Sequence, residues 1–434
     1  MPFPPDDAAT QSIASEHVSS RTLAGFDDRR ISDIHPGSSP VQAFSGTCSS
    51  ALLRWIARRL EAGHLLIDTP DGGSCALDSG RPGPQARLTV HRWRLLWRLL
   101  TGWDVGFAES YMAGDWSTPD LVRLLELGRR HCRTPAPSAS RLPLLLVKLR
   151  HALNRNTRRG SRRNIAAHYD LGNAFYAQWI DPGMTYSSAL YAAPDQTLED
   201  AQRAKLDRAI DLLALSGGET VLEIGCGWGS LAERMLGRHD CTVTGLTLSA
   251  EQLAYARERL AARGLQDRCE LRLQDYRDVR GSFDRIVSIE MLEAVGEAYW
   301  PAFFARLRDS LRPGGIAVLQ AITIDERIFD SYRRSPEFIQ RYIFPGGMLP
   351  TAAIVADEIA RAGLQLDSVE LFADSYARTL AEWQRRFQNA WPAIRELGFD
   401  TRFKRMWEYY LAYCQVGFES GDLDVALYRI SRPG

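Results

Sequence analysis

From about Leu198 onward, short apolar runs alternate with longer stretches whose apolar residues recur at helical spacing. Short apolar runs bounded by Gly, Asp or Ser are typical of buried parallel strands, and the stretches between them are typical of amphipathic helices. This alternation predicts a doubly wound α/β sheet. The expected strands are residues 220–226, 241–246, 269–273, 283–289, 316–322, 366–371 and 425–430, and the expected helices are residues 198–215, 231–236, 249–263, 351–362 and 377–413.

The chain before residue 164 follows other patterns. Residues 1–45 are rich in Ser, Asp, Pro and Ala without a sustained apolar period, which predicts a mobile leader. Residues 46–128 mix a helix candidate with strand-like runs and several Trp residues, which indicates a small α+β domain whose aromatic residues mostly form its core. Residues 129–163 predict a basic linker. We therefore expect this small domain to precede a larger α/β domain over residues 164–434.

Charge is balanced overall but unevenly spread. The chain has 53 basic and 53 acidic residues, yet the segment 128–169 contains eleven Arg or Lys and no Asp or Glu. A short apolar helix beside such cations can lie on an anionic membrane surface, where each cation contributes ~1 kcal/mol. A solvated linker explains the charge equally well. Nucleic acid would also attract it, but no nucleic-acid-binding motif is present, so we expect no nucleic-acid partner.

Cysteine spacing and hydropathy indicate the cellular compartment of the protein. The seven Cys residues form no Cys-x-x-Cys pair, so neither a metal site nor a disulfide framework is expected. No stretch approaches the ~18 apolar residues of a membrane span. These patterns predict a cytoplasmic protein that meets the inner face of the membrane peripherally.

The most informative segment is a glycine-rich loop that follows the first expected strand of the larger domain. Gly225, Gly227 and Gly229 form a Gly-x-Gly-x-Gly pattern. In the dinucleotide-binding fingerprint Gly-x-Gly-x-x-Gly, two residues separate the second glycine from the third, whereas here only one does. This difference argues against NAD as the cofactor. With Glu223 ahead of the first glycine, the segment resembles motif I of the S-adenosylmethionine-dependent methyltransferases. Asp275-Tyr276 after the third strand, and the fourth and fifth strands, follow in the order of that fold.

One feature departs from that class. The second strand ends in Gly-Leu-Thr-Leu-Ser, without the acidic residue that many members use to bind the ribose. Thr247, Ser249 and Gln252 could supply hydrogen bonds instead, although Ser249 and Gln252 are equally explained as a helix-capping box. The cofactor contacts implied by the resemblance are Tyr186, Ser187, Glu223, Gly225, Gly227, Gly229, Thr247, Leu248, Gln252, Asp275 and Tyr276.

Further motifs narrow the class. The chain resembles the cyclopropane-fatty-acyl-phospholipid synthases and the mycolic acid cyclopropane synthases, densely over residues 160–434 and loosely over 106–116. This resemblance implies a Rossmann-like class I methyltransferase domain, and it implies that the small N-terminal domain over residues 46–128 is lipid-associated. The segments that carry it begin at His168, Met184, Leu253, Gln274, Glu290, Tyr342 and Trp407.

The resemblance implies transfer of the S-adenosylmethionine methyl group to the double bond of an unsaturated acyl phospholipid, followed by proton loss to close a cyclopropane ring. In this family a bicarbonate ion is held at the reacting centre by a Cys, a Glu, a His, a Tyr and a backbone group. Glu293 and Tyr376 match the Glu and the Tyr, and Ile322 matches the backbone position. Ser188 and Gln320 stand where the Cys and the His would be.

Ser and Gln keep hydrogen-bonding capacity, so an anion such as bicarbonate could still be held. The same pair, together with Glu-Ala-Val-Gly from residue 293, resembles the plant-type cyclopropane synthases. A ring is therefore the favoured product. A methyl- or methylene-branched chain, a small soluble methyl acceptor, a non-catalytic scaffold and a homodimer stay open. Six aromatic residues could stabilise a cation, although most such residues belong to the core: Tyr342, Phe344, Tyr376, Trp383, Phe387 and Tyr409.

Overall fold

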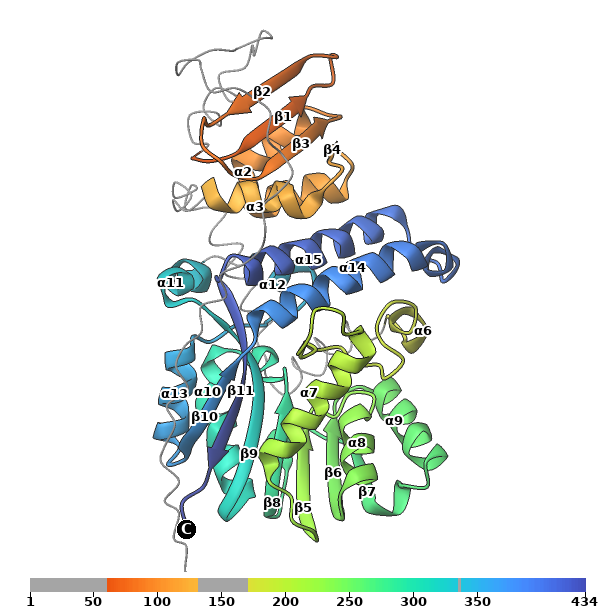
Figure 1. Cartoon of the computed structure of the whole chain (residues 1–434), viewed down its shortest axis with the longest axis vertical. Coiled ribbons are helices and arrows are strands. Elements are labelled where there is room, and N and C mark those ends of the chain that lie inside the picture. Colours follow the sequence, from red (N-terminus) through yellow and green to blue (C-terminus); the bar gives the residue numbers. More distant parts are fainter. Residues whose placement is uncertain (1–60, 132–170, 335–336) are drawn as a thin grey trace, which may run out of the picture. The chain divides into compact units, whose positions relative to one another are not determined.

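The computed structural model describes residues 61–131, 171–334 and 337–434 (Figure 1). The predicted leader, most of the predicted basic linker and His168 lie outside these residues. The boundaries of the leader, the linker and the two domains stay predictions. Within the described ranges, no helix is long and apolar enough to cross a membrane.

The larger part is built on a seven-stranded sheet with the order β10-β11-β9-β8-β5-β6-β7. The five strands from β9 to β7 are parallel, whereas β11 is antiparallel to both β9 and β10. All seven expected strands are present, and the fifth is longer than expected because it begins at Leu311. The strands are β5 Glu219–Ile224, β6 Cys241–Thr247, β7 Cys269–Leu273, β8 Phe283–Ile289, β9 Leu311–Ile324, β10 Gln365–Leu371 and β11 Leu423–Ser431.

Helices cover both faces of this sheet, which explains the continuous apolar runs of its strands. Neighbouring strand residues alternate between two core clusters: Val221 and Val287 belong to one, and Leu222 and Ile286 to the other. The first cluster lies beneath α7, α8 and α9, and the second beneath α10 and α13 (Figure 1). These helices are α7 Leu198–Leu213, α8 Ser230–Arg238, α9 Ala250–Ala262, α10 Trp300–Ser310 and α13 Ala352–Arg361.

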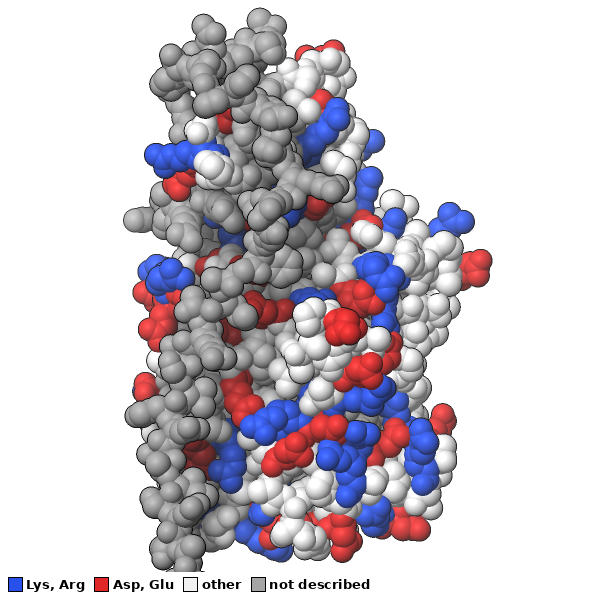
Figure 2. Space-filling view, in the orientation of Figure 1, with Lys and Arg blue, Asp and Glu red and all other residues white. Residues whose placement is uncertain are grey.

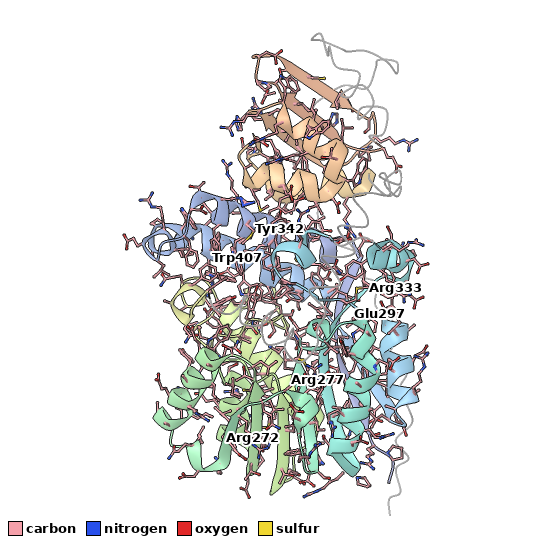
Figure 3. All side chains as sticks on the ribbon, turned by 180° about the vertical axis from the view of Figure 1, so that it is seen from behind. Arg272, Arg277, Glu297, Arg333, Tyr342 and Trp407 are labelled. Atoms are coloured by element: carbon pink, nitrogen blue, oxygen red, sulfur yellow. The ribbon has the colours of Figure 1, made fainter. Side chains whose placement is uncertain are left out.

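A further layer of helices lies beyond one end of the strands (Figure 1). The single helix expected over 377–413 is wrong: α14 Ala373–Glu396 and α15 Thr401–Glu419 are separate helices. Gly398, at φ 99°, reverses the chain between them, and the Asp400 side chain caps α15 by accepting from the Phe403 N–H at 2.7 Å. Figure 3 labels Trp407 of α15 and Tyr342 of α12 in this layer. The remaining elements are α6 Asn173–Tyr176, α11 Glu326–Arg334, α12 Phe338–Tyr342 and the 3-10 turns Gln266–Arg268, Tyr276–Asp278, Leu292–Ala294 and Glu297–Tyr299.

The smaller part has the α+β character that its sequence predicts. Its sheet has the order β2-β1-β3-β4, and α2 and α3 pack against α15. Trp116 is fully buried, but Trp93 and Trp97 are 42% and 69% exposed, so the expectation of core aromatics is wrong for these two residues. The elements are β1 His64–Asp68, β2 Ser74–Asp78, β3 Gln85–Val90, α2 Arg94–Met112, β4 Trp116–Ser117 and α3 Leu121–His131.

Charges on the described surface are mixed. Figure 2 shows basic and acidic side chains interspersed on one face of the larger part. Ion pairs account for some of them: Arg234 of α8 donates to Asp207 of α7 through two hydrogen bonds of 2.7 Å. The basic excess expected over 129–163 falls almost entirely outside the described residues.

Candidate active site

The glycine loop turns sharply between β5 and α8. Gly225, Gly227 and Gly229 have φ angles of 87°, 52° and 83°, a backbone region that residues with a side chain rarely adopt. A Cβ atom on Gly229 would lie 3.0 Å from the Cβ of Ala256 in α9. The loop therefore needs glycine for its conformation and, at Gly229, also for close packing against α9.

Glu223 lies near the end of β5, just before the glycine loop. Its side chain is 3% exposed, and its Oε2 atom has no hydrogen-bond partner among the described residues. Burial raises the pKa of its carboxyl to about 8, and the charge of Lys205 acts in the opposite direction. A buried carboxylate oxygen without a donor, just before a glycine loop that is open at Gly227, suits a ligand that brings a cation or an N–H group.

Polar groups at the end of β6 bind one another. The Thr247 hydroxyl donates to Gln252 Oε1 at 2.9 Å and accepts from the Ser249 N–H at 3.1 Å. Ser249 Oγ accepts from the Gln252 N–H at 3.2 Å and caps α9, and the half-buried Leu248 lies between these residues. The reciprocal half of the expected capping box is replaced by the bond from Ser249 to Thr247. The predicted ribose ligands thus form one ordered cluster.

Asp275 and Tyr276 are held by a residue that sequence analysis did not single out. Arg277 donates to both carboxylate oxygens of Asp275, at 2.9 and 2.6 Å. Its guanidinium carbon also lies 5.6 Å from the Tyr276 ring centre and 5.8 Å from that of Tyr299. Figure 3, which views the molecule from behind, labels Arg277. Asp275, which is 2% exposed, is thereby fixed after β7.

Helix α7 holds the loop that contains Tyr186, Ser187 and Ser188. The amide of Gln202 donates to the Ser187 carbonyl at 2.8 Å, and Lys205 Nζ donates to Ser187 Oγ at 2.6 Å. The Tyr186 hydroxyl is hydrogen-bonded to that of Tyr410 in α15 at 3.0 Å.

Lys205 is fully buried, and burial lowers the pKa of its ammonium to about 8 against the opposing charges of Glu290, Asp181 and Glu223. It is the one buried Lys or Arg among the residues described. Sequence analysis missed Lys205, because nothing in its surroundings along the chain distinguishes it from a solvated helix residue.

The centre of the site is Glu290, directly after β8. Its Oε1 accepts from the Ser188 N–H at 2.8 Å and from Gln320 Nε2 at 2.7 Å, and its Oε2 accepts from the Tyr376 hydroxyl at 2.7 Å. Three of the positions predicted to hold an anion thus surround a carboxylate of the chain itself. At Ser188 the backbone N–H makes this contact, while the hydroxyl donates to the Ala189 carbonyl at 2.9 Å.

Glu290 is held in an unusual state. Its φ of 48° lies in the left-handed region, which is costly for a residue with a side chain and is characteristic of functional sites. Burial raises the pKa of its carboxyl, although the Ser188 N–H, the Lys205 charge and the hydroxyl of Tyr376 each lower it. The residue as a whole is half-buried. The motif that begins at Glu290 was recognised in the sequence, but no role was predicted for this side chain. Its position at the carboxyl end of a central strand was the available signal.

The other two predicted catalytic groups bind each other. The Ile322 N–H donates to Glu293 Oε1 at 2.5 Å, and Glu293 Oε2 is buried without a hydrogen-bond partner among the described residues. Burial, followed by the nearby charge of Glu290, raises the pKa of Glu293 to about 8. Of the five predicted catalytic positions, Ser188, Gln320 and Tyr376 therefore bind Glu290, and Ile322 binds Glu293.

Two of the six candidate aromatic residues adjoin this centre. The Trp383 ring lies 5.3 Å from that of Tyr186 and 6.3 Å from that of Tyr376. The others serve packing or distant contacts: the Tyr342 hydroxyl donates to Glu109 at 2.6 Å, and Tyr409 stacks on Tyr413. Phe387 packs on Trp179 and Trp407, and Phe344 contacts Tyr410.

The sheet, the glycine loop and the polar ends of β5 to β8 define a class I S-adenosylmethionine-dependent methyltransferase. The family model described as mycolic acid cyclopropane synthetase matches residues 156–428, and the chain belongs to this family. Tuberculostearic acid methyltransferase UfaA1 of Mycobacterium tuberculosis is 40% identical over 406 residues, covering 91% of this chain and 93% of that protein.

Two further relatives agree with this assignment. The cyclopropane-fatty-acyl-phospholipid synthase of Escherichia coli is 36% identical over 332 residues, covering 76% of this chain and 83% of that protein. The crystal structure of mycolic acid cyclopropane synthase CmaA1 complexed with SAH and CTAB has a TM-score of 0.59 and 30% identity, and covers 62% of this chain and 98% of that one. The predicted fold class, family and enzyme class are confirmed, and so is S-adenosylmethionine as the cofactor, whereas bicarbonate stays a prediction.

The residues present fit S-adenosylmethionine. At Gly227 a Cβ atom would have no neighbour within 4 Å, so the glycine loop is open to a ligand there, and the unpartnered Glu223 oxygen suits a cationic or N–H-bearing group. Tyr186, Ser187 and the cluster after β6 lie on the neighbouring elements. This chain is therefore an S-adenosylmethionine-dependent enzyme of a family that modifies fatty acyl lipids.

Proposed function

We propose that the protein transfers the methyl carbon of S-adenosylmethionine to the double bond of an unsaturated acyl chain of a membrane phospholipid and forms a cyclopropane ring. The cofactor supplies an electrophilic methyl group on a sulfonium. The alkene electron pair forms the new carbon–carbon bond, which leaves a cation on the second alkene carbon. Loss of a proton from the transferred methyl group then supplies the electron pair that closes the ring.

The observation that carries this proposal is the carboxylate of Glu290 inside the hydrogen bonds of Ser188, Gln320 and Tyr376. A carboxylate beside the reacting carbons can accept the proton and stabilise the cation until the ring closes. The predicted bicarbonate ion was assigned to these same donors. We propose that Glu290 takes the role of that ion, with Glu293 next to it.

The aromatic groups support the same chemistry. Tyr376 contacts Glu290 through its hydroxyl, and the Trp383 ring lies 6.3 Å from the Tyr376 ring in an edge-to-face arrangement. A desolvated cation beside an aromatic face gains ~2 kcal/mol. The hydrogen bond from the Tyr376 hydroxyl to Glu290 fixes the tip of this side chain in the site. These side chains would exclude water, which otherwise captures the cation as an alcohol.

A branched product is the second candidate. UfaA1, named as a tuberculostearic acid methyltransferase, matches nearly the full length of both chains. A hydride shift before proton loss converts the same cation into a methylene-branched chain, and no new residue is needed for that step. The site would then differ from a ring-forming site only in how quickly Glu290 removes the proton.

The test is the fatty-acid profile of cells that express the chain, together with turnover by the purified enzyme on unsaturated phospholipid vesicles. The proposal predicts an acyl product heavier by one CH2 group, with S-adenosylhomocysteine formed in equal amount. Derivatisation of double bonds separates the ring, which lacks one, from the methylene branch. Methylation of small soluble acceptors with no acyl product would contradict the proposal. We also propose peripheral attachment to the inner face of the membrane, without nucleic acid as a partner.

A further inference from the structure

Helix α2 carries the most exposed cluster of large apolar side chains in the part of the chain that the structure describes. Trp93, Trp97 and Leu100 are 42%, 69% and 65% exposed. Their spacings of four and three residues place them on one face of the helix. Leu95, on the opposite face, is 3% exposed and packs into the core of the small sheet domain.

The exposed face of α2 lies next to a break in the helix. Trp103 has φ 49° and ψ −124°, which breaks the helix after Gly102. The following segment folds back closely: a Cβ atom on Gly106 would lie 1.9 Å from the carbonyl oxygen of Arg98, and Arg98 Nη1 donates to the Glu109 carbonyl at 2.9 Å. The exposed face thus adjoins a tight helical turn held by contacts across the break.

Positive charge accompanies the exposed face. Arg92, Arg94 and Arg98 all approach the fully buried carboxylate of Asp115, at 3.8, 2.7 and 3.1 Å. Three guanidinium groups share one carboxylate, so two positive charges are in excess. The side chains of Arg92 and Arg94 are 63% and 48% exposed and remain accessible to a second anion.

We infer that the face formed by Trp93, Trp97 and Leu100, with the arginines beside it, docks on an anionic phospholipid bilayer. This inference rests on the proposed function, because the acyl chain to be modified belongs to a bilayer lipid. Trp side chains favour the boundary between headgroups and acyl chains, and guanidinium groups pair with lipid phosphates. We call this surface the α2 docking face.

The chemistry favours a bilayer over a second protein chain. A stable protein interface usually needs ~800 Å² on each partner and a complementary shape, which three side chains at a helix turn do not provide. Binding to a fluid bilayer needs no complementary shape, and both inserted apolar side chains and cationic contacts with anionic lipids strengthen it. The face would supply the surface through which the small domain, which is predicted to be lipid-associated, meets the membrane beside the predicted basic linker.

The test compares the full-length protein with the double variant Trp97→Ala/Leu100→Ala. Leu371→Ala is the matched control, because Leu371 is 63% exposed on β10, outside the α2 docking face. The probes are vesicles of phosphatidylcholine with phosphatidylglycerol and vesicles of phosphatidylcholine alone. Flotation measures binding, and turnover is measured on vesicles and on the same lipid dispersed in detergent micelles.

The expected result is a loss of anionic-vesicle binding of at least about tenfold in the double variant, with no loss in the control. Turnover on vesicles should fall with it, while turnover on micelles and S-adenosylmethionine binding stay unchanged. Leu100→Glu, a single surface change, should reproduce the loss. Added salt should weaken binding of the parent protein, because it screens the arginines.

Unchanged vesicle binding in the double variant would overturn the inference. Unchanged binding together with a shift from dimer to monomer in light scattering would assign the face to a second copy instead. If the parent protein binds vesicles through this face but makes no acyl product on any lipid, the docking face stands and the proposed function fails. If acyl product forms but vesicle binding is unchanged when these side chains are replaced, the proposed function stands and the inference of the docking face fails.

Discussion

Replacing Glu290 by Gln removes a negative charge but almost no volume. The amide oxygen of the new side chain can still accept from the Ser188 N–H and from Gln320, and its amide N–H can donate to the Tyr376 hydroxyl oxygen, so the hydrogen bonds around the site are retained in number. The fold and the cofactor loop should therefore be preserved. What is lost is the acceptor for the proton and the charge that faces the cation.

The expected loss follows from the role of a positioned base. General-base catalysis contributes about 10²- to 10⁴-fold, or roughly 3 to 5 kcal/mol of barrier. Acyl product from labelled S-adenosylmethionine should fall by that factor in single-turnover assays on micelle-dispersed lipid, while the Kd of the cofactor by calorimetry changes by less than about threefold. Wild-type turnover in the E290Q variant would refute the assignment of Glu290.

A companion variant separates an internal carboxylate from a bound anion. Glu290→Ala leaves Ser188, Gln320 and Tyr376 facing an emptied space, so added bicarbonate should restore part of the activity with saturation. Glu290→Gln fills that space and should not respond. If the parent enzyme itself requires bicarbonate and both variants stay active with it, the ion and not Glu290 accepts the proton.

Three further outcomes are expected. Glu293→Gln should abolish product with cofactor binding nearly intact, because it disturbs the group that binds the Ile322 N–H; full activity would remove Glu293 from the mechanism. Lys205→Met should move the acidic limb of the pH–rate profile to higher pH, since Lys205 lowers the pKa of Glu290, which must be ionised to accept a proton; an unmoved limb contradicts this coupling. Gly229→Ala should weaken cofactor binding and cost about 1 to 3 kcal/mol in a denaturant melt, because of the positive φ and the contact with Ala256; an unchanged midpoint would show that the loop can relax.

The sheet could be predicted because its signal is local. The central strands are short apolar runs that can be recognised from neighbouring residues alone, and the strand 283–289 was predicted to the residue. Residues 377–413 were wrongly predicted to form one helix, because their apolar spacing continues through the Gly398 turn that separates α14 from α15. The exposed Trp97 could not be recognised either, since an apolar residue type does not reveal which helix face is covered.

The site was partly predictable for a different reason. Motif resemblance located Ser188, Gln320 and Tyr376, and the structure brings them together from three separate elements. The group at their centre, Glu290, was missed because its partners are far away along the chain and a lone Glu usually lies in solvent. Lys205 was missed for the same reason, since its burial arises only when α7 packs on the loop that contains Ser187.

The most direct test of the central claim uses S-adenosylmethionine with a deuterated methyl group, the purified enzyme and a phospholipid whose acyl chains carry a single cis double bond. The account predicts an acyl product that has gained one carbon and keeps two of the three deuterium atoms of the transferred methyl group, because one leaves to the base. An acyl product that keeps all three would contradict proton removal from that carbon, and label found only in a small soluble acceptor would contradict the account as a whole.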